Sequence, residues 1–289
     1  MANPYFSSAP AFSDQGGKTP AGYPAMPGYQ VGAHPTPPDR EQQTNAISAR
    51  DLHAHYQQPA ASALETGRMT LDDAIMKTGI VLGTIVAVAA LHWIVIGPSA
   101  LLTYGGLAAG FVLGLINAVK RVPSPALIMA YAVAEGAFLG GISAMFEAAF
   151  QGIVSQAILA TIATFAVCLV LYKTGTVRVS ARSTRLLLIA MLGYLVFSLV
   201  NLVLMATGVS SGSFGLRSVT IMGIPLGIVI GIFAVFLAAW CLIQDFDSIE
   251  QGIARGLPHQ YAWGAAFGIA VTLVWMYLEF LRILAIFRD

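Results

Sequence analysis

The sequence predicts an all-α integral membrane protein with seven transmembrane helices. The 289-residue chain is 57% hydrophobic and only 10% charged, whereas a soluble domain carries about 25% charged residues. Seven apolar runs of bilayer-spanning length follow one another between short polar or Gly- and Pro-containing separators. In lipid such a run must be helical, because every backbone amide has to be paired internally.

Residues 1–68 differ from the rest of the chain. They mix Pro, Gly, Ala, Ser and Gln without a repeating apolar face, so they cannot bury enough surface to offset the entropy lost on ordering. We therefore expect a disordered, Pro/Gly-rich cytoplasmic tail at 1–68 and a seven-helix transmembrane domain at 69–289.

Order is expected to begin at Thr70, which can cap a helix whose first turn contains Asp73, as in a capping box. The predicted spans are residues 78–97, 100–119, 125–146, 153–172, 185–207, 219–244 and 262–287.

Breakers and polar residues separate these spans, in order, at 97–99, 120–123, 151–152, 173–185, 208–217 and 256–258. Glycines four residues apart in the second, third and sixth spans favour close helix packing. Pro225 is expected to kink the sixth helix.

The cations that flank the spans predict the orientation. With the N-terminus in the cytoplasm, nine of them lie inside and only two, Arg217 and Arg288, lie outside. Cytoplasmic loops are enriched in Lys and Arg. We therefore expect a plasma-membrane protein whose N-terminus is cytoplasmic and whose C-terminus is outside.

Ionisable residues inside the spans are the candidate functional residues, because each is costly at that depth and tends to face a partner or a water-filled cavity. They are Glu135, Asp245, Glu279 and Arg282, with Asp247 at the inner boundary. His92, in the first span, is expected to be a packing residue.

Two arrangements of Glu279 are open. It can pair with Arg282, three residues later on the same helix face. Alternatively it faces Asp245 across the last hairpin, where two neighbouring carboxyls would share a proton and act as a proton sensor. Oxygen ligands of that kind also suit transient contact with calcium.

The other two acids have alternatives as well. Glu135 is either protonated or paired with a cation from another helix, and it serves either function or packing. Asp247 lies about 200° around the helix from Asp245, so we expect it at the cytoplasmic interface.

Other functions find no support in the sequence. The net charge of +1 and the lack of a basic cluster argue against nucleic-acid binding. Neither a phosphate-binding loop nor an H-E-x-x-H motif occurs, and the seventh span has no lysine for a retinal. We expect no enzymatic activity and no cofactor, only a proton or calcium as the sensed or transported ion.

The stretches 242–249 (LIQDFDSI) and 273–281 (LVWMYLEFL), together with the seven spans, resemble the Bax inhibitor-1, or transmembrane Bax inhibitor motif, family. The resemblance is to its bacterial branch with a long N-terminal extension, and it covers about residues 70–289. It implies six helices packed around a central seventh, and a pH-sensitive calcium leak controlled by an acidic pair.

On this resemblance Asp245 and Glu279 match the acidic pair. The family also carries an arginine at the inner end of the second helix that latches the pair, and the nearest candidates here are Lys120 and Arg121. Three features depart from the pattern: Glu replaces Asp at 279, Glu135 is an additional acid, and Asp245 and Glu279 lie 34 residues apart.

A second reading is a non-conducting membrane regulator that binds a quality-control protease or a stress-response protein, with the tail as a docking arm. A secondary transporter is a third and weaker reading. The lipid bilayer is an expected partner on every reading, and the sequence leaves the oligomeric state open.

Overall fold

The computed structural model describes residues 67–209, 214–221 and 223–288, so the predicted tail at 1–68 lies outside the described residues except for its last two positions. Seven helices in the described part are long and apolar enough to cross a membrane. The predicted all-α membrane fold is therefore confirmed.

The chain order of these helices matches the predicted order of spans. The helices are α4 (Leu71–Ala90), continued by the π-helix η2 (Leu91–Ile96), then α5 (Ala100–Val119), α6 (Pro125–Ala149), α7 (Ile153–Lys173), α8 (Ala181–Ala206), α9 (Leu226–Ala254) and α10 (Tyr261–Arg288). Between α8 and α9 lie the 3-10 helix η3 (Gly215–Ser218) and a short hairpin of β1 (Thr220–Ile221) and β2 (Ile224–Pro225).

The predicted start of the domain agrees with the structure. The Thr70 side chain accepts a hydrogen bond of 3.1 Å from the backbone N–H of Asp73 and caps α4. This bond satisfies one of the N–H groups that a helix start leaves unpaired.

The expected kink at Pro225 is wrong. Pro225 pairs with Thr220 in the hairpin and directly precedes α9, which begins at Leu226 and continues to Ala254. A proline before the first turn removes no intrahelical hydrogen bond, so α9 starts after it instead of bending around it.

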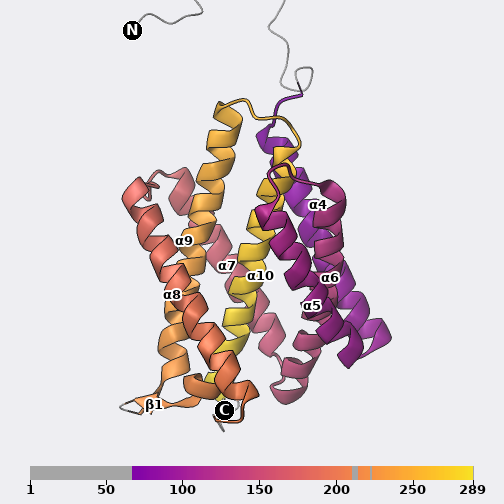
Figure 1. Cartoon of the computed structure of the whole chain (residues 1–289), viewed down its shortest axis with the longest axis vertical. Helices are drawn as coiled ribbons and strands as arrows, with labels where there is room; N and C mark the ends of the chain where they lie inside the picture. The colour runs from indigo at the N-terminus through magenta and orange to yellow at the C-terminus, as the bar shows by residue number, and fades with distance from the viewer. Residues whose placement is uncertain (1–66, 210–213, 222, 289) are drawn as a thin grey trace, which may run out of the picture. The chain divides into compact units, whose positions relative to one another are not determined.

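Helix α10 is the centre of the bundle, as the family resemblance implied (Figure 1). It packs against α4, α6, α7 and α9, while α5 packs on α6, and α8 packs on α9 and η3. All three hydrophobic clusters of the described residues include α10 side chains, among them Met276, Val274 and Leu281. Side chains on α10 can therefore meet residues from most of the other helices.

Glycines allow several of these helices to approach closely. A Cβ atom at Gly106 of α5 would lie 2.7 Å from the Ala134 carbonyl oxygen of α6, and one at Gly136 of α6 would lie 2.7 Å from the Ile85 carbonyl oxygen of α4. No side chain fits at these distances, so the predicted packing role is confirmed there. Gly223 instead occupies the hairpin turn with φ of +84°.

The outside of the bundle exposes large apolar side chains. Leu101 of α5 and Ile94 of η2 are about four-fifths exposed, and α8 exposes apolar residues along its length. Soluble proteins rarely expose so continuous an apolar surface to water. It is the surface of a multi-pass protein in contact with the lipid bilayer.

Candidate functional site: two polar clusters in the bundle

Asp245 lies half-buried between α9 and the central helix α10. Its Oδ2 accepts a hydrogen bond of 2.9 Å from Thr272 Oγ1, and its Oδ1 lies beside Gly268. The same Thr272 hydroxyl lies 3.0 Å from the Gly268 carbonyl oxygen, and its single proton can serve only one of these acceptors at a time. No ion pair of the described residues includes Asp245. Its polar partner is thus a neutral hydroxyl.

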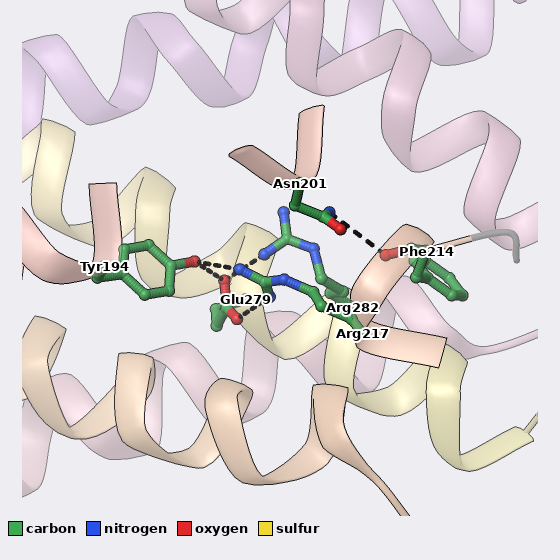
Figure 2. A network of polar contacts seen from close by, with 6 residues as sticks. All are labelled: Tyr194, Asn201, Phe214, Arg217, Glu279 and Arg282. Atoms are coloured by element: carbon green, nitrogen blue, oxygen red, sulfur yellow. Dashed lines mark hydrogen bonds and ion pairs between the residues drawn. The ribbon is translucent and has the colours of Figure 1, made fainter. Parts of the chain in front are cut away.

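Glu279 belongs to a second cluster, which we call the Glu279 cluster (Figure 2). Its members are Tyr194, Arg217, Glu279 and Arg282. Glu279 is completely buried. Its Oε1 accepts from Arg217 Nη1 at 2.8 Å, and its Oε2 accepts from Tyr194 Oη at 2.9 Å and from Arg282 Nη1. Both carboxylate oxygens are therefore occupied by donors.

Tyr194 closes the cluster into a ring. Arg217 Nη2 donates to Tyr194 Oη at 2.9 Å, while Tyr194 Oη donates to Glu279. The Arg217 guanidinium also lies 5.5 Å from the Tyr194 ring centre and 5.6 Å from that of Phe197, within cation–π range. Residues from α8, η3 and α10 are joined in this way.

The structure does not bring Asp245 and Glu279 together. Thr272, the partner of Asp245, and Glu279 lie seven residues apart on α10, which is about 10 Å along the helix axis. The expected shared proton is wrong for this arrangement, and so is a calcium contact formed by both carboxyls at once. The alternative, a pair of Glu279 with Arg282, is the one that forms.

The expected latch at the end of the second helix is also wrong. Lys120 and Arg121 are exposed where α5 ends, and no ion pair within the described ranges joins either of them to an acid. Arg217 supplies the cation instead. It reaches Glu279 from the short connection between α8 and α9.

Arg217 was not among the predicted site residues and was counted only as a cation on the outer side of the membrane. It is only 4% exposed. Burial by itself lowers the pKa of the guanidinium, but Glu279 and Tyr194 outweigh burial and raise that pKa above its ordinary value, so Arg217 stays charged. The available signal was its place next to Leu216 and two residues before Val219, in a segment that is otherwise free of charge.

Glu135 lies on α6 at its contact with α5. A Cβ atom at Gly110 of α5 would be 2.7 Å from Glu135 Oε2, so the carboxyl fills the space that this glycine leaves. Tyr131, one turn earlier, is its polar neighbour. The structure places no cation beside Glu135 in an ion pair among the described residues, which disfavours the expected pairing with another helix.

His92 is a packing residue, as expected, and Asp247 lies on the outside of α9, while the side of the membrane that it faces stays a prediction. Asp247 accepts a hydrogen bond of 2.6 Å from Gln251 on the exposed face of α9. His92 is buried, with Nδ1 2.6 Å from the Ala137 carbonyl oxygen, and its Nε2 accepts from the Ser99 N–H at 3.4 Å. These contacts fit a neutral ring protonated at Nδ1, which joins the end of the first span to α6.

No group of three or more His, Cys, Asp or Glu residues in the described ranges is arranged to hold a metal ion. The bundle instead holds two carboxyls beside neutral partners, Asp245 with Thr272 and Glu135 with Tyr131, and one carboxyl, Glu279, held by two cations. Donors occupy both oxygens of Glu279, whereas no ion pair of the described residues involves Asp245 or Glu135.

Comparison with known families adds one match. A family model described as Bax inhibitor 1 like matches residues 3–289. No curated protein matches the sequence.

Proposed function

This chain is a multi-pass membrane protein of the Bax inhibitor 1-like family, and we propose that it permits a slow, pH-sensitive leak of calcium or a similar cation. The observation that carries the proposal is Asp245. An ionisable side chain at that depth marks an ion or proton pathway by default, and Asp245 faces the central helix with a hydroxyl as its one hydrogen-bond partner among the side chains that the structure describes. The proposal includes no catalysed reaction and no resident cofactor.

Asp245 is the proposed proton-responsive group. The groups around it are Thr272 and Gly268 on α10 and the thiol of Cys241 one turn earlier on α9. None of them carries a compensating positive charge. Protonation of Asp245 therefore changes the net charge of this part of the bundle, and a passing cation would experience that change directly.

Glu279 has a different proposed role from the one that the sequence suggested. Because Arg217 and Arg282 occupy its oxygens, it offers no free ligand to a cation in this conformation. We assign the described conformation to a closed form in which Asp245 remains open to protonation.

The test uses purified full-length protein in calcium-loaded vesicles. Wild type should release calcium at a rate that changes after a pH step, and Asp245→Asn should abolish most of that pH dependence. Asp247→Asn is the matched control, since that acid lies two residues away on the exposed face, and it should behave as wild type. A leak that responds neither to pH nor to Asp245→Asn would contradict the proposal.

The absence of any release would instead favour the non-conducting regulator, whose binding of a protease or a stress-response protein is then tested by crosslinking with and without residues 1–68. The proposed location is the plasma membrane, with the N-terminus in the cytoplasm and the C-terminus outside.

A further inference from the structure

The segment Phe214–Ser218, between α8 and α9, is unusual for a connection. Connecting segments normally run over the surface because their backbone groups need water. This one packs against α8 and α9, buries Gly215 and Arg217, and places the Arg217 guanidinium beside the central helix. We call it the 214–218 plug.

Contacts that involve no charge seat the backbone of the plug. Asn201 Oδ1 accepts from the Leu216 N–H at 2.7 Å, and Asn201 Nδ2 donates to the Phe214 carbonyl oxygen at 3.3 Å. Gly227 gives the plug room, since a Cβ atom there would lie 2.9 Å from the Arg217 carbonyl oxygen. The shape of α8 and α9 therefore fits this segment independently of the ion pair.

The Arg217 side chain then occupies the carboxylate of the central helix. Its Nη1 donates a hydrogen bond of 2.8 Å to Glu279 Oε1, and its Nη2 donates one of 2.9 Å to Tyr194 Oη. The Arg217 side chain is 4% exposed, whereas the Arg282 side chain is 31% exposed. Arg217 is thus the inner of the two cations.

A buried ion pair of this kind is weak evidence for stability, because the loss of hydration of two charges offsets most of their attraction. It is better suited to a switch, since removing Arg217 leaves the completely buried Glu279 with Arg282 as its one remaining ion-pair partner among the described residues. Here one partner, Arg217, belongs to the short connection between α8 and α9 rather than to a spanning helix, so it is the partner that can leave.

We propose that the 214–218 plug is a gate at the hairpin end of the bundle, in which Arg217 must withdraw from Glu279 before a cation can pass that carboxyl. This inference rests on the proposed cation leak and adds its regulation at a second position, about two helical turns from Asp245. A cation cannot contact an oxygen that already holds a guanidinium, and the charge of Arg217 repels it. Withdrawal frees Oε1 and removes the charge of Arg217, while Arg282 stays on Oε2.

The first experiment measures calcium release from vesicles containing the full chain. Arg217→Gln should raise the initial rate at least about tenfold, because Glu279 then keeps only its Oε2 partners, Arg282 and Tyr194, and the loss of the inner cation destabilises the closed form. Arg217→Lys keeps the charge but not the planar fork, so it should give a smaller increase. Arg288→Gln is the matched control, because this exposed arginine bonds to Gln151 and Gln156 outside the cluster, and it should leave the rate unchanged.

A second variant tests the plug without altering any charge. Asn201→Ala removes the two hydrogen bonds that seat the backbone, and it should also raise the release rate. If Arg217→Gln does not fold, this variant still decides the question.

A labelling experiment follows the plug without relying on ion flow. Leu216→Cys is introduced where Cys168 and Cys241 have been replaced by Ala, and its reaction with a membrane-impermeant maleimide is timed. Labelling should be slow, and Asn201→Ala should accelerate it at least about tenfold, as loss of two buried hydrogen bonds predicts.

Equal labelling with and without Asn201→Ala would overturn the plug. If wild type releases calcium and neither Arg217→Gln nor Asn201→Ala changes the release rate, the gate is overturned but the leak is not. Release from no variant, wild type included, would reject calcium conduction itself and the gate with it.

Discussion

Tyr194 is the residue that turns separate contacts into a cluster. Its hydroxyl accepts from Arg217 and donates to Glu279, each at 2.9 Å, and its ring packs on Trp275 of α10 with centres 5.4 Å apart. Hydrogen bonds to charged groups contribute more than neutral ones, and in a buried site they cannot be replaced by water. One hydroxyl therefore supports two helices and the plug.

Removing that hydroxyl should lower stability without disturbing the packing. Tyr194→Phe keeps the ring and should reduce the free energy of unfolding by about 2 kcal/mol, the contribution of a hydrogen bond to a charged group. Thermal unfolding of the purified protein in detergent measures the effect. Tyr104→Phe removes a hydroxyl from an exposed tyrosine of α5 and should change nothing. Equal melting temperatures for the two variants would contradict the role of Tyr194.

The sequence predicted the candidate site residues better than it predicted the contacts between them. Asp245, Glu279 and Arg282 stand out because each interrupts an apolar run. Their partners Thr272, Tyr194 and Arg217 do not, because a threonine or tyrosine is common in a span and Arg217 lies in a connection. Arg217 and Glu279 are 62 residues apart, so their contact depends on where the connection runs, which hydropathy does not report.

At the level of helices, α6 shows how small residues determine packing. Gly136 faces α4, where a Cβ atom would lie 2.7 Å from the Ile85 carbonyl oxygen and 2.8 Å from Val88 Cβ. Gly141 faces α5, with Thr103 Oγ1 in the space that a side chain would fill. Membrane helices associate through such close contacts, since lipid supplies no hydrophobic force between them.

A larger residue at Gly136 should separate α4 from α6. Gly136→Val should reduce the free energy of unfolding by about 3 kcal/mol, the upper range for overpacking a tight core, and lower the yield of monodisperse protein. Gly193→Val is the matched control, because Gly193 of α8 has no neighbour within 4 Å of its Cβ position. Size-exclusion profiles and melting curves that do not distinguish the two variants would contradict this prediction.

The existence and order of the spans could be predicted, but several ends could not. The fifth span was expected to begin at 185, whereas α8 begins at Ala181, where Ser180 accepts from the Ser183 N–H. The sixth was expected at 219–244, whereas α9 covers 226–254. Hydropathy reports burial in lipid, while caps and turn residues determine where a helix starts, so polar helical turns beyond the apolar run escape it.

At the level of the whole molecule, the structure changes what the flanking cations mean. Two of those counted for orientation are neutralised inside the fold. Lys77 is buried and bonds to Asp73 at 2.7 Å and to the His259 carbonyl oxygen at 2.8 Å, and Arg217 is held by Glu279. Lys77 was counted on the inner side and Arg217 on the outer side, so each side loses one cation. The excess of cations therefore still lies at the end of the bundle where α4 begins and α9 ends (Figure 1).

This excess predicts which end faces the cytoplasm, because exposed Lys and Arg are retained there. Single cysteines in a chain with Cys168 and Cys241 replaced by Ala test it in intact cells. Val209→Cys, at an exposed residue shortly after the end of α8, should react with an impermeant maleimide added outside. Thr176→Cys, in the exposed connection between α7 and α8, should react only after permeabilisation. The reverse pattern would invert the topology, and it would place the 214–218 plug on the cytoplasmic side.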